Sequence, residues 1–213
     1  MTILILSNTA NVAYYNMLEN CINSIGEYPI IVVETNTKLK GKRIPLEDKA
    51  KFIFPEEEFN YNRFLNIGIS KIDTDRFIIS NNDVIYEPGC VHEINSRLSY
   101  YDSVSPVDLL NPKSIQSFGP CIEGYEIEVH VNGCCIGMTK KTYNTIGKFD
   151  ENFKFWYQDN DYANLLRKHN LKHALIRDAK VKHLGHQSHK LLGEKHHDMT
   201  HGLEKTYKDK WFE

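Results

Sequence analysis

The stretch FIISNNDVIYEPG, residues 77–89, runs from a short apolar segment directly into Asn81, Asn82 and Asp83. Such an apolar run is typical of a strand buried on both faces, which is the kind of strand found in parallel sheets. A carboxylate at the end of a buried strand usually faces a site and not the core. We therefore predict a bound metal ion as the partner of Asp83, the alternative being that Asp83 caps a turn before Pro88.

Strands and helices are predicted to alternate through the first hundred residues. Nearly continuous apolar runs occur at 2–8, 30–34 and 50–54, and helical spacing of apolar residues occurs at 11–26 and 60–72. This alternation predicts an α/β fold with a mostly parallel central sheet flanked by helices. Ligands of such sheets bind beyond the carboxyl ends of the strands. That rule places one crevice beside the following residues: Asn8, Glu34, Asn81, Asn82 and Asp83.

The second half of the chain has a different pattern. Residues 127–139 predict one or two strands, and a short helix is expected at 140–146. Another helix is expected after Gln158, and residues 173–185 predict a strand pair or an extended segment. In the tail, Leu203, Tyr207 and Trp211 recur every four residues, which predicts an amphipathic helix that docks on the body.

Composition excludes few functions. A net charge of −2 shows no overall excess of basic residues for nucleic acid or an anionic membrane, although a local basic patch would not be visible in that total. The five cysteines lack the C-x2-C spacing of zinc or redox motifs, which favours reduced thiols in a cytoplasmic protein. The opening MTILILSNTA has no charged leader region, and we expect a soluble protein without a transmembrane segment.

Four segments together are similar to conserved blocks of a known enzyme family. They are IIVVETNT (30–37), the opening stretch, the long block VNGCC to RKHN (131–170), and KVKHLGHQSHK (180–190). In this order they resemble glycosyltransferase family 2, the GT-A enzymes that transfer a sugar from a nucleotide diphosphate donor. The resemblance implies one GT-A domain over 1–213, with a nucleotide-sugar-binding half at 1–100, an acceptor and catalytic half at 101–195, and a C-terminal loop and helix at 196–213.

The resemblance implies roles for residues on the donor side. Glu34 would contact the nucleoside together with Asn8, although Glu34 could also be a solvated loop carboxylate, and Arg63 would touch phosphate or ribose. The segment Asn81-Asn82-Asp83 stands where the family has D-x-D, so Asp83 would be the carboxylate ligand of Mn²⁺ or Mg²⁺.

The histidine-rich segment corresponds to the loop that closes over the donor diphosphate. His183 would be a metal ligand or phosphate contact, and Ser188 would follow it. His186 and His189 invite a zinc interpretation, but no second ligand cluster accompanies them. Basic residues that follow His189 could stabilise the leaving diphosphate. The sequence does not show which of them does so: Lys190, Lys195, His196, His197 or His201.

The acceptor-side block carries the predicted general base. Gln158-Asp159-Asn160-Asp161 stands where the family has an E-D-x-D helix start, and the resemblance assigns proton removal to Asp159. A helix N-terminus is expected to keep that carboxylate ionised. Asp161 is an alternative base, or it caps the helix and pairs with Arg167 or a lysine. Both carboxylates could also serve only the helix dipole.

The resemblance thus implies a metal-dependent inverting glycosyltransferase that uses a nucleotide-diphospho-sugar, with UDP the expected nucleotide, and transfers to a surface glycan. Transfer to a modified DNA base, or a non-catalytic nucleotide-sugar-binding module, are the alternatives. A nucleotidyltransferase fits less well, because SNTANVAYY after the first strand lacks the glycines and lysines that cradle a triphosphate. Trp156 and Tyr157 are candidates for stacking on a sugar ring, or for packing.

Overall fold

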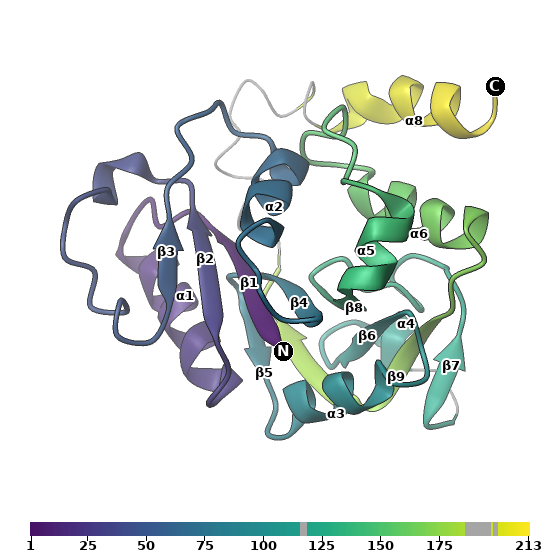
Figure 1. The fold of residues 1–213 in the computed structure, drawn as a ribbon, viewed down its shortest axis with the longest axis horizontal. Coiled ribbons are helices and arrows are strands. Elements are labelled where there is room, and N and C mark those ends of the chain that lie inside the picture. Colours follow the sequence, from purple (N-terminus) through teal and green to yellow (C-terminus); the bar gives the residue numbers. More distant parts are fainter. Residues whose placement is uncertain (116–118, 186–196, 198–199) are drawn as a thin grey trace.

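The computed structural model of the chain describes residues 1–115, 119–185, 197 and 200–213. Within these residues, nine strands form a single sheet in the order β3-β2-β1-β4-β8-β6-β9-β5, with β7 paired to β9 (Figure 1). The strands are β1 (Thr2–Ser7), β2 (Ile30–Glu34), β3 (Lys51–Ile53), β4 (Arg76–Asn81), β5 (Val84–Tyr86), β6 (Ser103–Asp108), β7 (Cys121–Glu123), β8 (Cys135–Thr139) and β9 (His173–His183).

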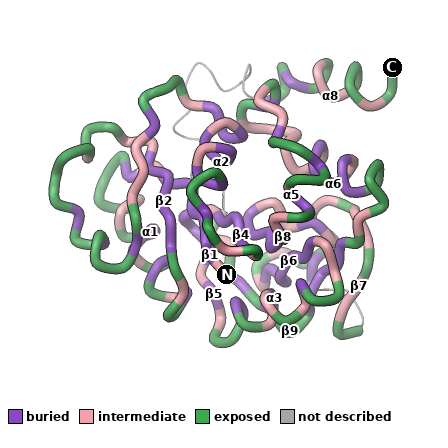
Figure 2. The backbone as a smooth tube through the Cα atoms, in the orientation of Figure 1, coloured by how far each residue is buried: buried purple, intermediate pink, exposed green. Residues whose placement is uncertain are grey.

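Helices cover both faces of this sheet. The α-helices are α1 (Val12–Ile25), α2 (Tyr61–Ile69), α3 (Cys90–Arg97), α4 (Pro112–Ile115), α5 (Lys140–Ile146), α6 (Gln158–Lys168) and α8 (Glu204–Trp211), and two 3-10 turns are η1 (Thr37–Leu39) and η4 (His201–Leu203). Alternate residues of β1 point to opposite faces. Ile3 and Ile5 pack in one core with α1 and α3, whereas Leu4 and Leu6 pack in a second core with α2, α5 and α6. The strands between the two cores are buried along most of their length (Figure 2).

The first half forms the predicted parallel sheet. β3, β2, β1 and β4 run parallel to one another, with Ser7 opposite Glu34 and Leu6 opposite Asn81. These registers bring the carboxyl ends of β1, β2 and β4 to one edge. The predicted crevice was expected at this edge, and the strand ends meet there as expected.

The second half completes the sheet with mixed pairing. β8 lies between β4 and β6 and is antiparallel to both, and β9 is parallel to β6. Of the one or two strands predicted at 127–139, only β8 forms as a ladder; Ile127 and Val131 make an isolated bridge within a turn. Residues 173–183 form one long strand and not a pair, with a register shift opposite Pro106 and Val107.

The C-terminal helix α8 docks on the body, as its apolar spacing predicts. Tyr207 packs against Phe153 and Tyr157, and Leu203 is buried just before the helix begins. In Figure 1, α8 lies at the top right of the view, above α6. No helix among the described ranges has the length and apolar composition needed to cross a bilayer.

Candidate active site

A cavity of about 1190 Å³ opens at the carboxyl ends of the central strands. Loops after β1, β4 and β6, the end of β9 and the first turn of α6 supply its walls. Of the nine described residues to which the resemblance assigns a place in the donor, metal or base site, six line this cavity: Asn8, Asn81, Asn82, Asp83, Asp159 and His183. The other three, Glu34, Arg63 and Asp161, lie outside its lining. Ser188 falls outside the described residues, as do His186, His189 and His196.

Asp83 and His183 meet because β5 and β9 are antiparallel neighbours. Val84 pairs with His183 in the ladder, so the residue just before Val84 lies beside the end of β9. His183 Nε2 lies 3.2 Å from Asp83 Oδ1, and the Asp83 side chain is only 7% exposed. Burial alone would lower the pKa of His183, but the adjacent Asp83 carboxylate outweighs burial, and the pKa of His183 is raised.

The Asp83–His183 pair fits two ligands of one divalent cation. Asp83 Oδ1 is buried and has no well-directed hydrogen-bond donor among the described residues. Two atoms bound at adjacent positions of an octahedral Mg²⁺ lie roughly 3 Å apart, close to the separation seen here. The described residues contain no group of three or more His, Cys, Asp or Glu side chains suited to a metal. Such a cation would therefore need substrate and water for its remaining ligands.

The two asparagines before Asp83 hold the turn between β4 and β5. Tyr61 Oη donates to Asn81 Oδ1 at 2.9 Å, and Asn82 Nδ2 donates to Ser7 Oγ at 3.2 Å. Tyr61 itself lines the cavity and was not predicted as a site residue. These bonds fix the backbone that presents Asp83.

Glu34 lies beneath the cavity wall and is fully buried. Its Oε1 accepts hydrogen bonds from the backbone nitrogens of Thr9 at 3.0 Å and Asn36 at 2.7 Å, so Glu34 joins the loops after β1 and β2. The alternative that Glu34 is a solvated loop carboxylate is therefore wrong. Its Oε2, like Thr9 Oγ1 and Thr35 Oγ1, is buried with no partner among the described residues. Of these three residues, Thr35 lines the cavity.

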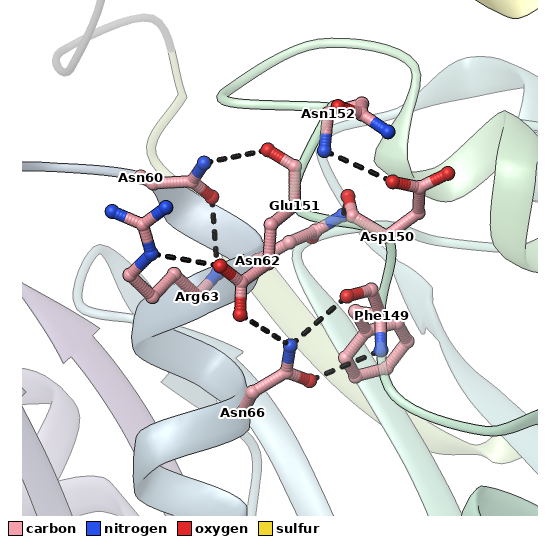
Figure 3. Close-up of polar contacts among 8 residues, drawn as sticks. All are labelled: Asn60, Asn62, Arg63, Asn66, Phe149, Asp150, Glu151 and Asn152. Atoms are coloured by element: carbon pink, nitrogen blue, oxygen red, sulfur yellow. Dashed lines mark hydrogen bonds and ion pairs between the residues drawn. The ribbon is translucent and has the colours of Figure 1, made fainter.

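Arg63 is not part of the cavity lining and belongs to a network that joins α2 to the turn after α5 (Figure 3). Arg63 Nε donates to Glu151 Oε2 at 2.8 Å. Asn66 holds both the carbonyl and the amide of Phe149, with distances of 2.9 and 3.0 Å. Asn60 and Asn62 donate to backbone carbonyls of the same turn. This network fixes the segment that leads into the first turn of α6.

Asp159 projects from the first turn of α6 into the cavity. Its Oδ1 accepts from the Asn160 backbone nitrogen at 2.9 Å. A Cβ added at Gly133 would lie 3.0 Å from Asp159 Oδ2, so the carboxylate packs against a position that has no side chain. Burial raises the pKa of Asp159 above its usual value. Burial of the carboxylate therefore acts against the helix N-terminus, which is expected to keep Asp159 ionised.

Asp161 lies one residue beyond Asn160 on the same helix but points away from the cavity. It is 1% exposed, and its Oδ1 lies 2.8 Å from both Trp211 Nε1 and Lys210 Nζ of α8. The contacts of Asp161 match the alternative in which it pairs with a lysine. Arg167, the other predicted partner, bonds instead to Asn164 and Tyr125. Asp161 anchors the C-terminal helix and does not reach the cavity where a base would act.

Aromatic side chains form one wall of the cavity, and they are Phe59, Tyr61, Phe155, Trp156 and Tyr157. Phe155 packs with Phe59 and Tyr61, while Trp156 meets the ring of His201 edge-on at 4.6 Å. Neither His197 nor His201 is part of the lining.

Asp108 is a cavity residue that the sequence interpretation missed. It ends β6, and its Oδ1 accepts from the backbone nitrogens of His183 at 3.1 Å and Leu110 at 3.0 Å. Asp108 thereby fixes the backbone that carries His183. The signal was present, because SVSPVD is another apolar strand that ends in a carboxylate, as FIISNND is.

Comparison with known proteins shows which known fold the chain is similar to. No family model and no curated protein matches the sequence. Among solved structures, the chain is similar to S. aureus TarS, with a TM-score of 0.64 and 11% identity, over 84% of this chain and 35% of the TarS chain. TarS is a family 2 glycosyltransferase. The fold is that of a GT-A glycosyltransferase. This likeness shows the fold alone, and family 2 membership stays a prediction from the motifs.

Proposed function

We propose that this chain is a metal-dependent inverting glycosyltransferase that transfers a sugar from a nucleotide-diphospho-sugar, with UDP the expected nucleotide, to an acceptor hydroxyl. The observation that carries the proposal is that Asp159 and the Asp83–His183 pair line the same cavity, at the carboxyl ends of the strands of a GT-A fold. A base and a cation site facing one space are what transfer to a hydroxyl requires.

The donor would lie against the ends of β1, β2 and β4. Asn8 and Thr35 would face the nucleoside, and Glu34 would hold their loops from below through Thr9 and Asn36. The unpartnered Oγ1 of Thr35, which lines the cavity, supports this placement, because buried polar atoms normally have a hydrogen-bond partner. Arg63 has no part in the proposed donor contacts.

The charge of the cavity supports dependence on a cation. Its described lining contains five carboxylates, those of Glu58, Asp83, Asp108, Glu128 and Asp159, and no Lys or Arg. A diphosphate placed among carboxylates is strongly disfavoured unless a cation accompanies it. Asp83 and His183 would hold Mn²⁺ or Mg²⁺, which when bound neutralises the departing diphosphate.

Asp159 would act as the general base. It would take the proton of the acceptor hydroxyl while the hydroxyl oxygen forms a bond to the anomeric carbon. The bond from that carbon to the diphosphate oxygen breaks on the opposite face, and its electron pair leaves with the nucleotide. A raised pKa suits the role, because a base works best when its pKa approaches the working pH.

The test is donor hydrolysis without acceptor, in which water replaces the hydroxyl. Purified protein would be incubated with a panel of nucleotide sugars and Mn²⁺ or Mg²⁺, and release of nucleoside diphosphate would be followed. We expect release from one donor, lost on chelation of the metal and in the Asp83→Ala and Asp159→Asn variants. Arg63→Ala, outside the cavity, is the matched control and should retain release.

Two outcomes of this experiment would count against the proposal. Release that persists in both Asp83→Ala and Asp159→Asn would refute the assignment of the site. If no donor is hydrolysed but one raises the melting temperature, the chain is a nucleotide-sugar-binding module and not an enzyme.

A further inference from the structure

The far side of the cavity from the donor strands is where an acceptor would bind. It is formed by the loop before α2, the turn at 127–128, and residues 155–160. The charged side chains in this part of the lining are Glu58, Glu128 and Asp159, with no Lys or Arg in its described residues. All the formal charge that the described residues place on this part of the lining is negative.

The surroundings extend this negative charge. Glu58 ends the exposed acidic run Glu56–Glu58, in which Glu56 pairs with Lys40, and this run leads into the aromatic wall. Glu128 pairs with Lys113 of α4, but Lys113 does not reach the lining, and the Lys113 and Glu128 side chains are 62% and 59% exposed. An ion pair this open to solvent is screened and holds its partners weakly. The entrance therefore offers little attraction for a second polyanion beside the donor.

The remaining acceptor-side lining is aromatic. Phe59, Phe155, Trp156 and Tyr157 supply flat apolar rings beside the carboxylates. Rings of this kind stack on the C–H faces of sugars, while carboxylates accept hydrogen bonds from sugar hydroxyls. Proteins that bind nucleic acid also use aromatic rings, but they combine them with Lys and Arg along the phosphate path.

We infer that the acceptor is an uncharged sugar, and that the carboxylates at the entrance select against polyanionic acceptors such as DNA or a phosphate-containing polymer. The inference rests on the proposed function, because it concerns the second substrate of the same cavity. The direction in which polyanion binding changes with salt concentration distinguishes this inference from a basic acceptor groove. Binding of a polyanion to a basic groove weakens as salt rises, whereas an acidic entrance repels it most at low salt.

The experiment uses the full chain with whichever donor it hydrolyses. Methyl glycosides of glucose, galactose, mannose and N-acetylglucosamine would be added as neutral probes, and a single-stranded DNA oligonucleotide and polyphosphate as polyanionic probes. Release of nucleoside diphosphate and the mass of any glycosylated product would be measured from low to high ionic strength. We expect at least one neutral probe to accelerate release and form product, with little effect of salt.

Two outcomes would overturn the inference while leaving the proposed function intact. One is glycosylation of the oligonucleotide or polyphosphate that is strongest at low salt. The other is donor hydrolysis that no neutral probe accelerates at any ionic strength. Absence of donor hydrolysis altogether would count against the proposed function itself, so the two failures are distinguishable.

Charge variants test the selecting residues directly. The double variant Glu58→Gln and Glu128→Gln should bind a labelled oligonucleotide more tightly than wild type at low salt, on the order of fivefold. Glu126→Gln removes an exposed carboxylate from the same turn but outside the cavity lining, and serves as the matched control. Equal gains in the double variant and in Glu126→Gln would show that net charge, and not the entrance, governs polyanion binding.

Discussion

The ring of Tyr207 stacks on the ring of Tyr157, with centroids 5.0 Å apart and planes 22° apart. Tyr157 has a φ of 65°, a left-handed conformation that costs a residue with a side chain about 1–2 kcal/mol. Its carbonyl accepts from the Asp161 backbone nitrogen at 2.8 Å and so starts α6. The stack from α8 thus stabilises the turn that aims Asp159 into the cavity.

Tyr207→Leu is predicted to impair turnover more than donor binding. Losing the stack lets the Tyr157 turn relax and misplaces Asp159, which should lower kcat by about tenfold with little change in the donor KM. Tyr207→Phe keeps the ring and loses only the 2.9 Å bond from Asn164 to the hydroxyl, so it should behave like wild type. Equal losses of kcat in the two variants would contradict a role for the stack, and melting temperatures would separate misfolding from misplacement.

Gly133→Ala is predicted to disturb Asp159 directly. The new Cβ would lie 3.0 Å from Asp159 Oδ2 and 3.3 Å from its Cβ, so the carboxylate must move by a few tenths of an ångström. Misplacing a catalytic group by that much should reduce kcat by about tenfold or more. The metal-dependent stabilisation of the protein by nucleoside diphosphate should be unchanged, and its loss would show that the effect had spread beyond Asp159.

The activity should have an acidic limb that reports Asp159. Because burial raises the pKa of this carboxylate, the active ionised form disappears at a higher pH than for an exposed aspartate. Activity is therefore expected to fall as pH decreases through that raised pKa. A profile of kcat against pH, measured at saturating metal and donor, checks this, and the residual rate of Asp159→Asn, which should lack the limb, is the control. An acidic limb at the ordinary aspartate value would mean that Asp159 is not desolvated in solution.

The sequence predicted features that depend on local pattern. Asp83 follows a strand whose burial is visible in the apolar run, so its place at the sheet edge could be inferred. Asp159 and Asp161 could not be separated in this way, because both lie in the first turn of one helix. Which way each side chain points depends on α8. Trp211 and Lys210, some fifty residues later in the chain, bind the carboxylate of Asp161. Arg63 was misassigned for the same reason, since its partner Glu151 is distant in sequence.

Asn66→Ala should be one of the more destabilising polar substitutions in the chain. Asn66 is 8% exposed and bonds both backbone groups of Phe149 (Figure 3). Its Oδ1 also accepts from Tyr143 Oη. Removing it leaves two backbone groups without partners, which should cost about 3 kcal/mol of unfolding free energy. Arg63→Ala, from the same network, breaks an ion pair whose side chains are 39% and 40% exposed and should cost less than about 1 kcal/mol. Denaturant unfolding of both variants would test the contrast, and similar losses would contradict it.

His173 is predicted to make the protein less stable in acid. Its Nε2 lies 3.0 Å from the His130 carbonyl and so carries the hydrogen, which leaves Nδ1 to accept from Ser103 Oγ at 2.8 Å. Tyr162 Oη in turn donates to Ser103 at 2.6 Å, so a second proton on His173 would reverse the Ser103–His173 bond and take from the Ser103 hydroxyl the acceptor of its own hydrogen. Burial lowers the pKa of His173 to about 4.

The sign of the pH effect follows from that lowered pKa. Below the unfolded value of roughly 6.5, the unfolded chain binds a proton that folded His173 refuses, so the free energy of unfolding falls as the pH drops from there to about 4, by about 3 kcal/mol in total. His173→Gln should remove this part of the pH dependence, measured by denaturant unfolding at several pH values. His169→Gln, at an exposed position, controls for loss of a histidine as such. If wild type and His173→Gln lose stability in parallel between these pH values, His173 is protonated in the folded protein and the proposed bonding chain is wrong.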